Sequence, residues 1–289
     1  MSAPTRPVLR YHGGKWRLAR WILSFFPDHR CYVEPFGGGA SVLLRKRRSE
    51  TEVYNDLDEE VVNLFRVLRD PPAASRLVEM CRLTPFSRVE FERSYEPTED
   101  DVERARRLVV RSFMGFGSSV LAKHATGFRD YSKAHERRRY PAGDWTNYPD
   151  CLRLCVERMA AVIVDARDAC EVIPRHDSLR TLYYVDPPYV LSTRGSARGV
   201  RQKYAVELTD DDHRRLACVL HDVRGYVVLS GHPSPLYDAL YTGWERHERP
   251  HMADGAEPRT EVVWLNAACS RALAAERSQL HLIDSGGAA

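Results

Sequence analysis

The chain alternates between short β-type runs and helical segments, and the runs end in acidic or glycine-rich turns. The first run, Cys31–Val33, leads into the turn Glu34–Gly39, and the second, Glu52–Asn55, closes on Asp56. Apolar periodicity predicts helices around these runs at about 15–25, 41–47 and 59–69. Such an alternation of strands and helices is typical of an α/β fold. The sequence therefore predicts the opening half of a nucleotide-type α/β domain.

The same alternation returns after about residue 150. Pro71-Pro72 ends the third predicted helix, because proline supplies no backbone donor and clashes with the preceding turn, and mostly helix and loop are expected from there to about 149. A helix capped by Thr209 is predicted in the later part of the chain. Strands are predicted at 161–164, 182–185, 226–230 and 261–266. The predicted division is a discontinuous catalytic domain, 1–70 and 150–270, an inserted domain, 71–149, and a C-terminal tail, 271–289.

The composition is that of a folded protein. Of the 289 residues, 43% are hydrophobic and 29% are charged, which allows a sizeable core and excludes a disordered chain. No apolar run approaches the roughly 18 residues that span a bilayer, and the N-terminal segment lacks the apolar stretch of a secretory signal. We therefore expect a soluble, intracellular protein with no membrane partner. The seven cysteines include no C-x-x-C pair, so we expect free thiols and no metal site.

Basic residues gather in one window, although the whole chain carries a net charge of only +3. Between residues 104 and 139, ten lysines and arginines accompany only two acidic residues, Asp130 and Glu136. A local basic stretch on a near-neutral protein indicates contact with a polyanion. The alternative is a solvated helix face whose charges pair elsewhere. The basic residues are Arg104, Arg106, Arg107, Arg111, Lys123, Arg129, Lys133, Arg137, Arg138 and Arg139.

Three segments that follow predicted strands carry candidate chemistry, because ligands of such sheets bind outside the carboxyl ends of the strands. The turn Glu34–Ser41 contains glycines that let the backbone approach a ligand, and the following helix N-terminus offers free N–H groups. This turn does not match G-x-G-x-x-G, so alone it is a weak signal. Asp56 stands where a carboxylate commonly accepts hydrogen bonds from ribose hydroxyls, or where it caps the next helix.

The third segment, Asp186-Pro187-Pro188-Tyr189, is the most specific. Its two prolines fix the backbone and cannot donate hydrogen bonds, so the carbonyl groups of this turn are left as rigid acceptors. A carboxylate, such carbonyls and an aromatic ring form a pocket for a planar ring that bears an amino group. The alternative is a simple end of a strand, with Tyr189 packed on the core.

With these segments in view, the sequence resembles the Dam-like family of N6-adenine DNA methyltransferases. Six matching segments occur in the family's order and cover both halves of the α/β domain, roughly residues 8–70 and 145–267. Six matches in order are far less expected by chance than any single motif. The segments are Tyr11-His-Gly-Gly-Lys15, Val33-Glu-Pro-Phe-Gly-Gly-Gly-Ala-Ser41, Tyr54-Asn-Asp-Leu-Asp58, Tyr184-Val-Asp-Pro-Pro-Tyr189, Leu229-Ser-Gly-His-Pro-Ser234 and Glu261-Val-Val-Trp-Leu-Asn266.

The resemblance implies an S-adenosylmethionine-dependent methyltransferase fold, a Rossmann-like mixed sheet, with a mostly helical inserted DNA-recognition domain. It also implies S-adenosyl-L-methionine as the methyl donor and adenine in double-stranded DNA as the target. The base would leave the duplex, and its amino nitrogen would attack the methyl group directly. We expect a monomer without a metal ion, acting in the cytoplasm and encoded by a prokaryote or a phage. The alternatives are an RNA or protein methyltransferase with the same Pro-Pro-Tyr turn, and a DNA-binding relative without activity.

The resemblance also assigns roles to individual residues of this chain. Its implied cofactor contacts are Tyr11, Lys15, Glu34, Phe36, Gly38, Asp56, Asp168 and Asp186. Its implied catalytic residues are Asp186, Pro187, Pro188 and Tyr189. The residues expected to bind DNA are Lys123, Arg129, Lys133, Arg137, Arg138 and Arg139. The sequence departs from the family pattern at Ala40, where a second glycine is usual, and at His232, where an aromatic residue is more typical. The insertion shows no clear match to the hairpin that reads GATC, so that recognition sequence is not carried over.

Overall fold

A computed structural model describes residues 3–116, 127–130, 141–193, 204, 206–252 and 258–286. Its strands are β1 (Cys31–Glu34), β2 (Thr51–Asn55), β3 (Ile163–Asp165), β4 (Thr181–Val185), β5 (Tyr226–Gly231), β6 (Glu245–Met252) and β7 (Pro258–Leu265). They form one seven-stranded sheet in the order β3-β2-β1-β4-β5-β7-β6. The first five in this order are parallel, whereas β7 runs antiparallel to both of its neighbours. The predicted mixed α/β sheet is therefore confirmed.

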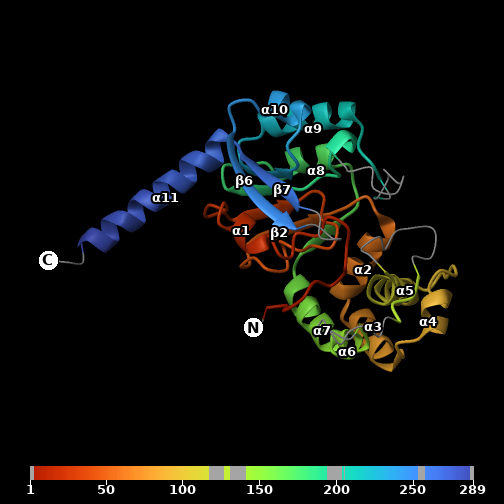
Figure 1. The fold of residues 1–289 in the computed structure, drawn as a ribbon. Coiled ribbons are helices and arrows are strands. Elements are labelled where there is room, and N and C mark those ends of the chain that lie inside the picture. The colour runs from red at the N-terminus through yellow and green to blue at the C-terminus, as the bar shows by residue number, and fades with distance from the viewer. Residues whose placement is uncertain are drawn as a thin grey trace.

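Helices cover both faces of this sheet (Figure 1). Within the described residues they are α1 (Ala19–Leu23), α2 (Glu59–Arg69), α3 (Pro71–Leu83), α4 (Arg88–Arg93), α5 (Asp101–Met114), α6 (Pro141–Thr146), α7 (Tyr148–Met159), α8 (Ala169–Arg175), α9 (Asp210–Asp222), α10 (Pro235–Leu240) and α11 (Ala267–Gly286). Successive side chains of a strand point to opposite faces. On β1, Tyr32 therefore packs in the cluster shared with α1, α2 and α7, and Val33 in the cluster shared with α8, α9 and α10.

The helices of the predicted insertion share a core with the sheet. Leu77 of α3, Leu108 of α5 and Trp145 of α6 belong to the same hydrophobic cluster as Tyr54 of β2 and Tyr184 of β4. Helix α5 also lies along α2, to which it is joined by ion pairs. The described part of the insertion therefore packs as one hydrophobic unit with the sheet.

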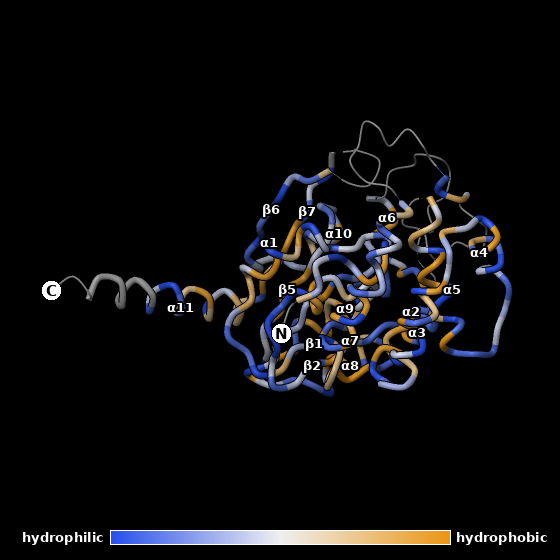
Figure 2. The backbone as a smooth tube through the Cα atoms, turned by 90° about the horizontal axis from the view of Figure 1, so that it is seen from below, coloured by the Kyte–Doolittle hydropathy of each residue, from blue (hydrophilic) through white to orange (hydrophobic). Residues whose placement is uncertain are grey.

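Helix α11 occupies most of the predicted C-terminal tail. Its first turns hold the buried residues Cys269 and Leu273, and its later part extends away from the sheet (Figures 1 and 2). Five alanines within residues 267–275 favour a helix over the first half of this segment, since alanine has the highest helix propensity. None of the helices in the described ranges is both long and apolar enough to span a membrane.

Three elements differ from the sequence-based predictions. The expected helix at 41–47 is a set of turns with two hydrogen bonds of helical spacing, because the chain must soon enter β2 at Thr51. The expected helix at 15–25 is reduced to α1. Strand β6 was not predicted, because its sequence is mostly polar at both alternating sets of positions, as Figure 2 shows.

Candidate active site

A cavity with about 770 Å³ of empty space opens at the carboxyl edge of the sheet. It is lined by the N-terminal segment 11–15, by the turn after β1, by Asp56–Asp58 after β2 and by Asp186 and Pro188 after β4. The three segments that the sequence singled out therefore meet at one cavity.

The glycine-rich turn is tightly packed against aromatic rings. Gly38 has a φ of +46°, and a Cβ placed there would lie 2.8 Å from the Tyr11 ring. A Cβ on Gly37 would lie 2.1 Å from the ring of Tyr54, whose hydroxyl donates to the Gly38 carbonyl at 2.8 Å. Ala40, which stands where the family usually has glycine, also adopts a positive φ of 50° and is fully buried. The turn keeps its left-handed geometry there at a cost of roughly 1 kcal/mol or more.

The sequence left two roles open for Asp56, ribose binding and capping of the next helix, and the structure tests the second of them. The Asp56 carboxylate accepts hydrogen bonds from the backbone N–H of Gly38 at 2.7 Å and of Asp58 at 2.9 Å, and so ties the glycine turn to β2. The cap of α2 is Asp58, whose Oδ1 accepts from Glu60 N and Val61 N. The capping alternative for Asp56 is therefore wrong.

The Asp186 carboxylate is engaged on one side only. Its Oδ2 lies 2.9 Å from Lys15 Nζ, whereas its buried Oδ1 has no hydrogen-bond partner among the described residues. Pro187 is buried, and Pro188 lines the cavity. Asp186 thus presents a buried acceptor oxygen at the cavity, next to a turn whose two prolines lack N–H groups.

Lys15 connects this turn to the last strand of the sheet. Its ammonium donates to the Gly13 carbonyl at 2.8 Å and lies 3.7 Å from Glu261 Oε1 of β7. It also lies 4.7 Å from the centroid of the Tyr189 ring. Burial disfavours the charge on Lys15, but Asp186 and Glu261 outweigh burial and raise the pKa of Lys15. Lys15 is therefore a buried cation held between two carboxylates.

Tyr189 is buried beside the cavity rather than on its wall. Its hydroxyl donates to Glu261, and its ring packs in a T-shaped arrangement with the ring of His232, with 4.5 Å between the two ring centroids. His232 Nδ1 is within 3.1 Å of the Thr260 carbonyl, and burial lowers the pKa of His232 to about 4. Glu261 was not among the predicted site residues, although the segment Glu261–Asn266 was one of the six family matches.

Glu34 is a buried acid at the end of β1. Its Oε2 accepts from the Tyr32 hydroxyl at 3.0 Å and from Leu43 N at 3.1 Å. Burial, together with the charge of Asp186, raises the pKa of Glu34 to about 8. The predicted cofactor contacts that line the cavity are Tyr11, Lys15, Glu34, Phe36, Gly38, Asp56 and Asp186.

Asp168 is the one predicted cofactor contact outside the cavity lining. Its Oδ1 accepts from Cys170 N at 2.7 Å as the cap of α8, and its Oδ2 lies 2.9 Å from Arg215. Its neighbours Arg167 and Ala169 line the cavity instead. No group of three or more potential metal-ligating side chains occurs within the described ranges. All seven cysteines are free, and Cys218 is exposed.

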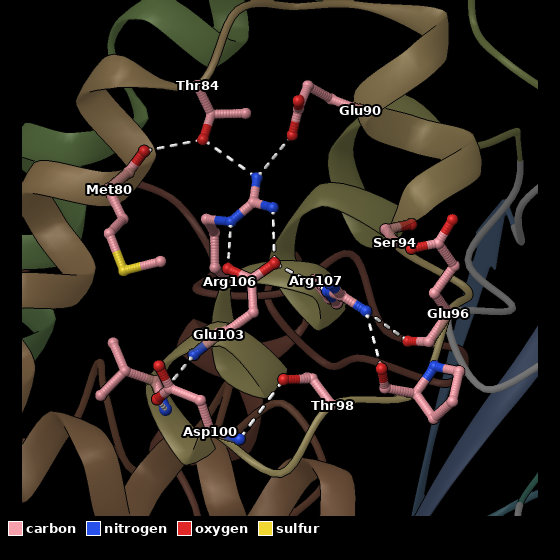
Figure 3. A network of polar contacts seen from close by, with 12 residues as sticks. Met80, Thr84, Glu90, Ser94, Glu96, Thr98, Asp100, Glu103, Arg106 and Arg107 are labelled. Carbon is pink, nitrogen blue, oxygen red and sulfur yellow. Dashed lines mark hydrogen bonds and ion pairs between the residues drawn. The ribbon is translucent and has the colours of Figure 1, made fainter.

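The basic window divides into two parts. Arg106 and Arg107 of α5 both donate to Glu103, and Arg106 also reaches Glu90 and Thr84 (Figure 3). The other two arginines of α5 in this window, Arg104 and Arg111, both pair with Glu60 of α2. The predicted alternative, charges that pair elsewhere in the protein, therefore holds for α5.

The predicted DNA contacts lie in the second part of the window. Arg129 is half-buried and donates to the Phe113 carbonyl at 3.0 Å. Burial and the charge of Arg10 lower the pKa of Arg129 to about 10. The other predicted DNA contacts, Lys123, Lys133, Arg137, Arg138 and Arg139, lie outside the described residues.

Comparisons with known proteins identify the family of this chain. A family model described as D12 class N6 adenine-specific DNA methyltransferase matches residues 11–254. A type II methyltransferase of Lactococcus lactis subsp. cremoris, M1.LlaDCHI, is 22% identical over 253 residues, which cover 84% of this chain and 87% of its own. A DNA adenine methylase of Vibrio cholerae is 24% identical over 249 residues, or 82% and 85% of the two chains. With this match over most of its length, the chain belongs to the D12 class of N6 adenine-specific DNA methyltransferases.

Proposed function

We propose that the protein is a site-specific DNA methyltransferase that moves the methyl group of S-adenosyl-L-methionine to N6 of an adenine in double-stranded DNA. Membership of the family supports methylation of adenine N6 in DNA. The observation that carries the finer proposal is the Asp186 carboxylate at the cavity. One of its oxygens lies on Lys15, and the other is buried and has no hydrogen-bond partner within the part of the chain that the structure describes. An adenine amino group offers two N–H donors, and one of them suits this oxygen.

The residues around the cavity fit the proposed cofactor. Gly37 and Gly38 let the backbone of the turn lie directly against the rings of Tyr54 and Tyr11, where a Cβ would not fit. Asp56 stands where ribose hydroxyls are commonly bound. Tyr11 and Phe36 supply ring surface, and two carboxylate oxygens of the cavity residues have no partner among the described residues. When bound, this cofactor would supply an electrophilic methyl group on a sulfonium.

Asp186 and Pro187 would prepare the amino nitrogen for attack. The lone pair of this nitrogen is delocalised into the adenine ring, which makes it a poor nucleophile. Hydrogen bonds from its two hydrogens to Asp186 Oδ1 and to the Pro187 carbonyl would favour a more tetrahedral nitrogen. No covalent intermediate with the protein is needed, and most of the rate gain would come from positioning and local electrostatics.

The target adenine would leave the duplex at a cost of a few kcal/mol. Stacking on Tyr189 would return roughly 1–3 kcal/mol, by analogy with other base–aromatic stacks. Because Lys15 lies over this ring, a base stacked on the same face requires Lys15 to move. Base entry and movement of Lys15 would therefore be linked.

We further propose that residues 71–149 form the target-recognition region and that residues 1–70 and 150–270 form the catalytic unit. The residues that we propose to contact the DNA backbone are Lys123, Arg129, Lys133, Arg137, Arg138 and Arg139. The charge of the basic window beyond α5 supports this assignment, because the arginines of α5 are already paired. The protein would act as a monomer in the cytoplasm of a prokaryote, from a chromosomal or phage gene.

Methyl transfer from labelled S-adenosylmethionine tests the proposal. Double-stranded DNA is incubated with the protein and then digested to nucleosides. The label is expected in N6-methyl-2′-deoxyadenosine. Asp186→Ala should lower the rate at least ~100-fold, because a lost transition-state acceptor typically costs that much. Its cofactor affinity should be kept only in part, because Asp186 is also a predicted cofactor contact. Asp222→Ala serves as the matched control, since Asp222 is an exposed aspartate at the end of α9.

Other outcomes of this experiment would favour the alternatives. Label in RNA or protein, but not in DNA, would replace the proposed substrate. DNA binding without any label would indicate a relative that has kept the fold and lost the reaction. Turnover by Asp186→Ala within tenfold of the parent would remove the proposed role of Asp186.

A further inference from the structure

Only one of the two carboxylate oxygens of Asp58 accepts hydrogen bonds from the described residues. Its Oδ1 caps α2 by accepting from Glu60 N at 3.0 Å and Val61 N at 3.4 Å. Its Oδ2 is buried and has no hydrogen-bond partner among the described residues. Only 6% of Asp58 is exposed, and the residue lines the same cavity as Asp56. A helix cap does not explain this second oxygen, because a buried acceptor without a partner costs free energy.

The Asp56 carboxylate can accept fewer hydrogen bonds from a ligand than its position in the cavity suggests. Its Oδ2 accepts from Gly38 N and its Oδ1 from Asp58 N, so both oxygens already hold the backbone of the site. A ribose presents two adjacent hydroxyl donors. Each carboxylate oxygen can accept two bonds, so Asp56 retains some capacity for them. The oxygen of this turn that has its full capacity free is Asp58 Oδ2.

We propose that Asp58 is a second ribose-binding residue, which accepts a hydrogen bond from one hydroxyl of the cofactor while Asp56 accepts from the other. This inference rests on the proposed function, since it takes S-adenosylmethionine as the ligand. Asp56 and Asp58 lie two residues apart on the turn after β2, both line the cavity, and the charge of Asp56 acts on the Asp58 carboxylate. The pair would therefore recognise a vicinal diol rather than a single hydroxyl.

The charges around Asp58 agree with a ligand hydroxyl that donates a hydrogen bond to its carboxylate. Burial and the neighbouring charge of Asp56 raise the pKa of Asp58 to about 6, and Glu60 of α2 acts in the same direction. The hydroxyls of Tyr11 and Tyr54 are the other titratable groups that interact with this carboxylate. A hydroxyl that donates to the ionised form stabilises it. Ligand binding near pH 6 should therefore release protons from Asp58.

The first test measures binding of S-adenosylhomocysteine by calorimetry. Asp58→Asn keeps an acceptor for the helix cap, since asparagine and aspartate cap helices about equally well. It replaces the free carboxylate by an amide, so affinity should fall about tenfold or more, as for loss of a hydrogen bond to a charged group. Asp70→Asn is the matched control, because Asp70 caps α3 in the same way but is exposed and outside the cavity lining.

The second test identifies the contacting group on the ligand. Wild-type protein should bind the 2′-deoxy and 3′-deoxy analogues of S-adenosylhomocysteine more weakly than the parent. Asp58→Asn should lose this discrimination for one of the two analogues and keep it for the other, whereas Asp70→Asn should keep both. Proton release near pH 6, obtained from binding heats in buffers of different ionisation enthalpy, should be smaller in Asp58→Asn than in wild type.

The outcomes separate this inference from the function on which it rests. If wild-type protein does not bind S-adenosylhomocysteine, the proposed function is wrong. If it binds, but Asp58→Asn keeps its affinity and its discrimination of both deoxy analogues, Asp58 is only a helix cap. Equal losses for both analogues and the parent would place the ligand contact elsewhere than on a ribose hydroxyl and would also overturn the inference.

Discussion

Lys15 contacts three side chains that lie far from it in the sequence, so the geometry of the site depends on this one lysine. Its ammonium joins Asp186, after β4, to Glu261 on β7 and covers the ring of Tyr189. Glu261 in turn accepts from the Tyr189 hydroxyl. Removing one partner of a buried charged pair leaves the other uncompensated. Glu261 should therefore act as a positioning residue for the Asp186–Tyr189 turn.

Glu261→Gln should lower kcat for methyl transfer about tenfold, because a neutral amide holds Lys15 and Tyr189 less firmly. Cofactor affinity should change little. Tyr189→Phe removes the same hydrogen bond from its other end, so the double variant should lose less than the sum of the single losses. The kcat values and the cofactor Kd are measured for all variants, with the exposed Glu171→Gln as the control. Strictly additive losses would show that the two side chains act independently.

At the scale of elements, the N-terminus of α9 shows how a few neighbouring residues determine where a helix begins. Thr209 Oγ1 accepts from Asp212 N at 3.2 Å, and Asp212 Oδ2 accepts from Thr209 N at 2.8 Å. This reciprocal capping box confirms the cap predicted from the sequence. Leu208, immediately before the cap, lines the cavity. The start of the helix therefore also fixes one wall of the site.

Thr209→Ala should lower the free energy of unfolding by about 1 kcal/mol, since the cap loses its side-chain acceptor. Thr209→Ser keeps the hydroxyl and should stay within a few tenths of a kcal/mol of the parent. Urea denaturation of the three proteins measures the differences at constant m-value. Equal stability of the alanine and serine variants would mean that the first turn of α9 is held by packing instead.

Elements whose signal is local could be predicted, and those set by distant neighbours could not. Strands β4 and β5 are mostly apolar and almost wholly buried, so their sequence identifies them. Strand β6 is mostly polar and is a strand only because it pairs with β7. The site follows the same rule. Asp186 could be predicted from its turn, but the contact of Lys15 with Glu261 could not, because it joins opposite ends of the chain.

At the scale of the whole molecule, the basic window between residues 104 and 139 divides into a paired part on α5 and a part beyond it. The basic window extends from α5 to residue 139, and each arginine of α5 in this window is paired with a carboxylate. Arg104 and Arg111 pair with Glu60, and Arg106 and Arg107 pair with Glu103. Asp101 also pairs with Arg104, and Glu90 with Arg106. The remaining basic residues of the window are therefore the ones that we propose to meet a polyanion. Contact with phosphates releases counterions and makes binding depend on salt.

Neutralising Arg137, Arg138 and Arg139 together should weaken DNA binding and flatten its salt dependence. Three adjacent arginines cannot all face the same way, so one or two phosphate contacts are the expected loss, and each lowers the log–log slope by about 0.9 for duplex DNA. Binding of duplex DNA is measured over a range of salt concentrations. Neutralising Arg66 and Arg69, exposed on α2, is the control and should leave the slope unchanged. Cofactor affinity should be the same in all three proteins, because the cavity is lined by other segments. A fixed slope together with a lower melting temperature would instead make the triplet a structural feature, and the DNA contacts would then have to lie elsewhere in residues 71–149.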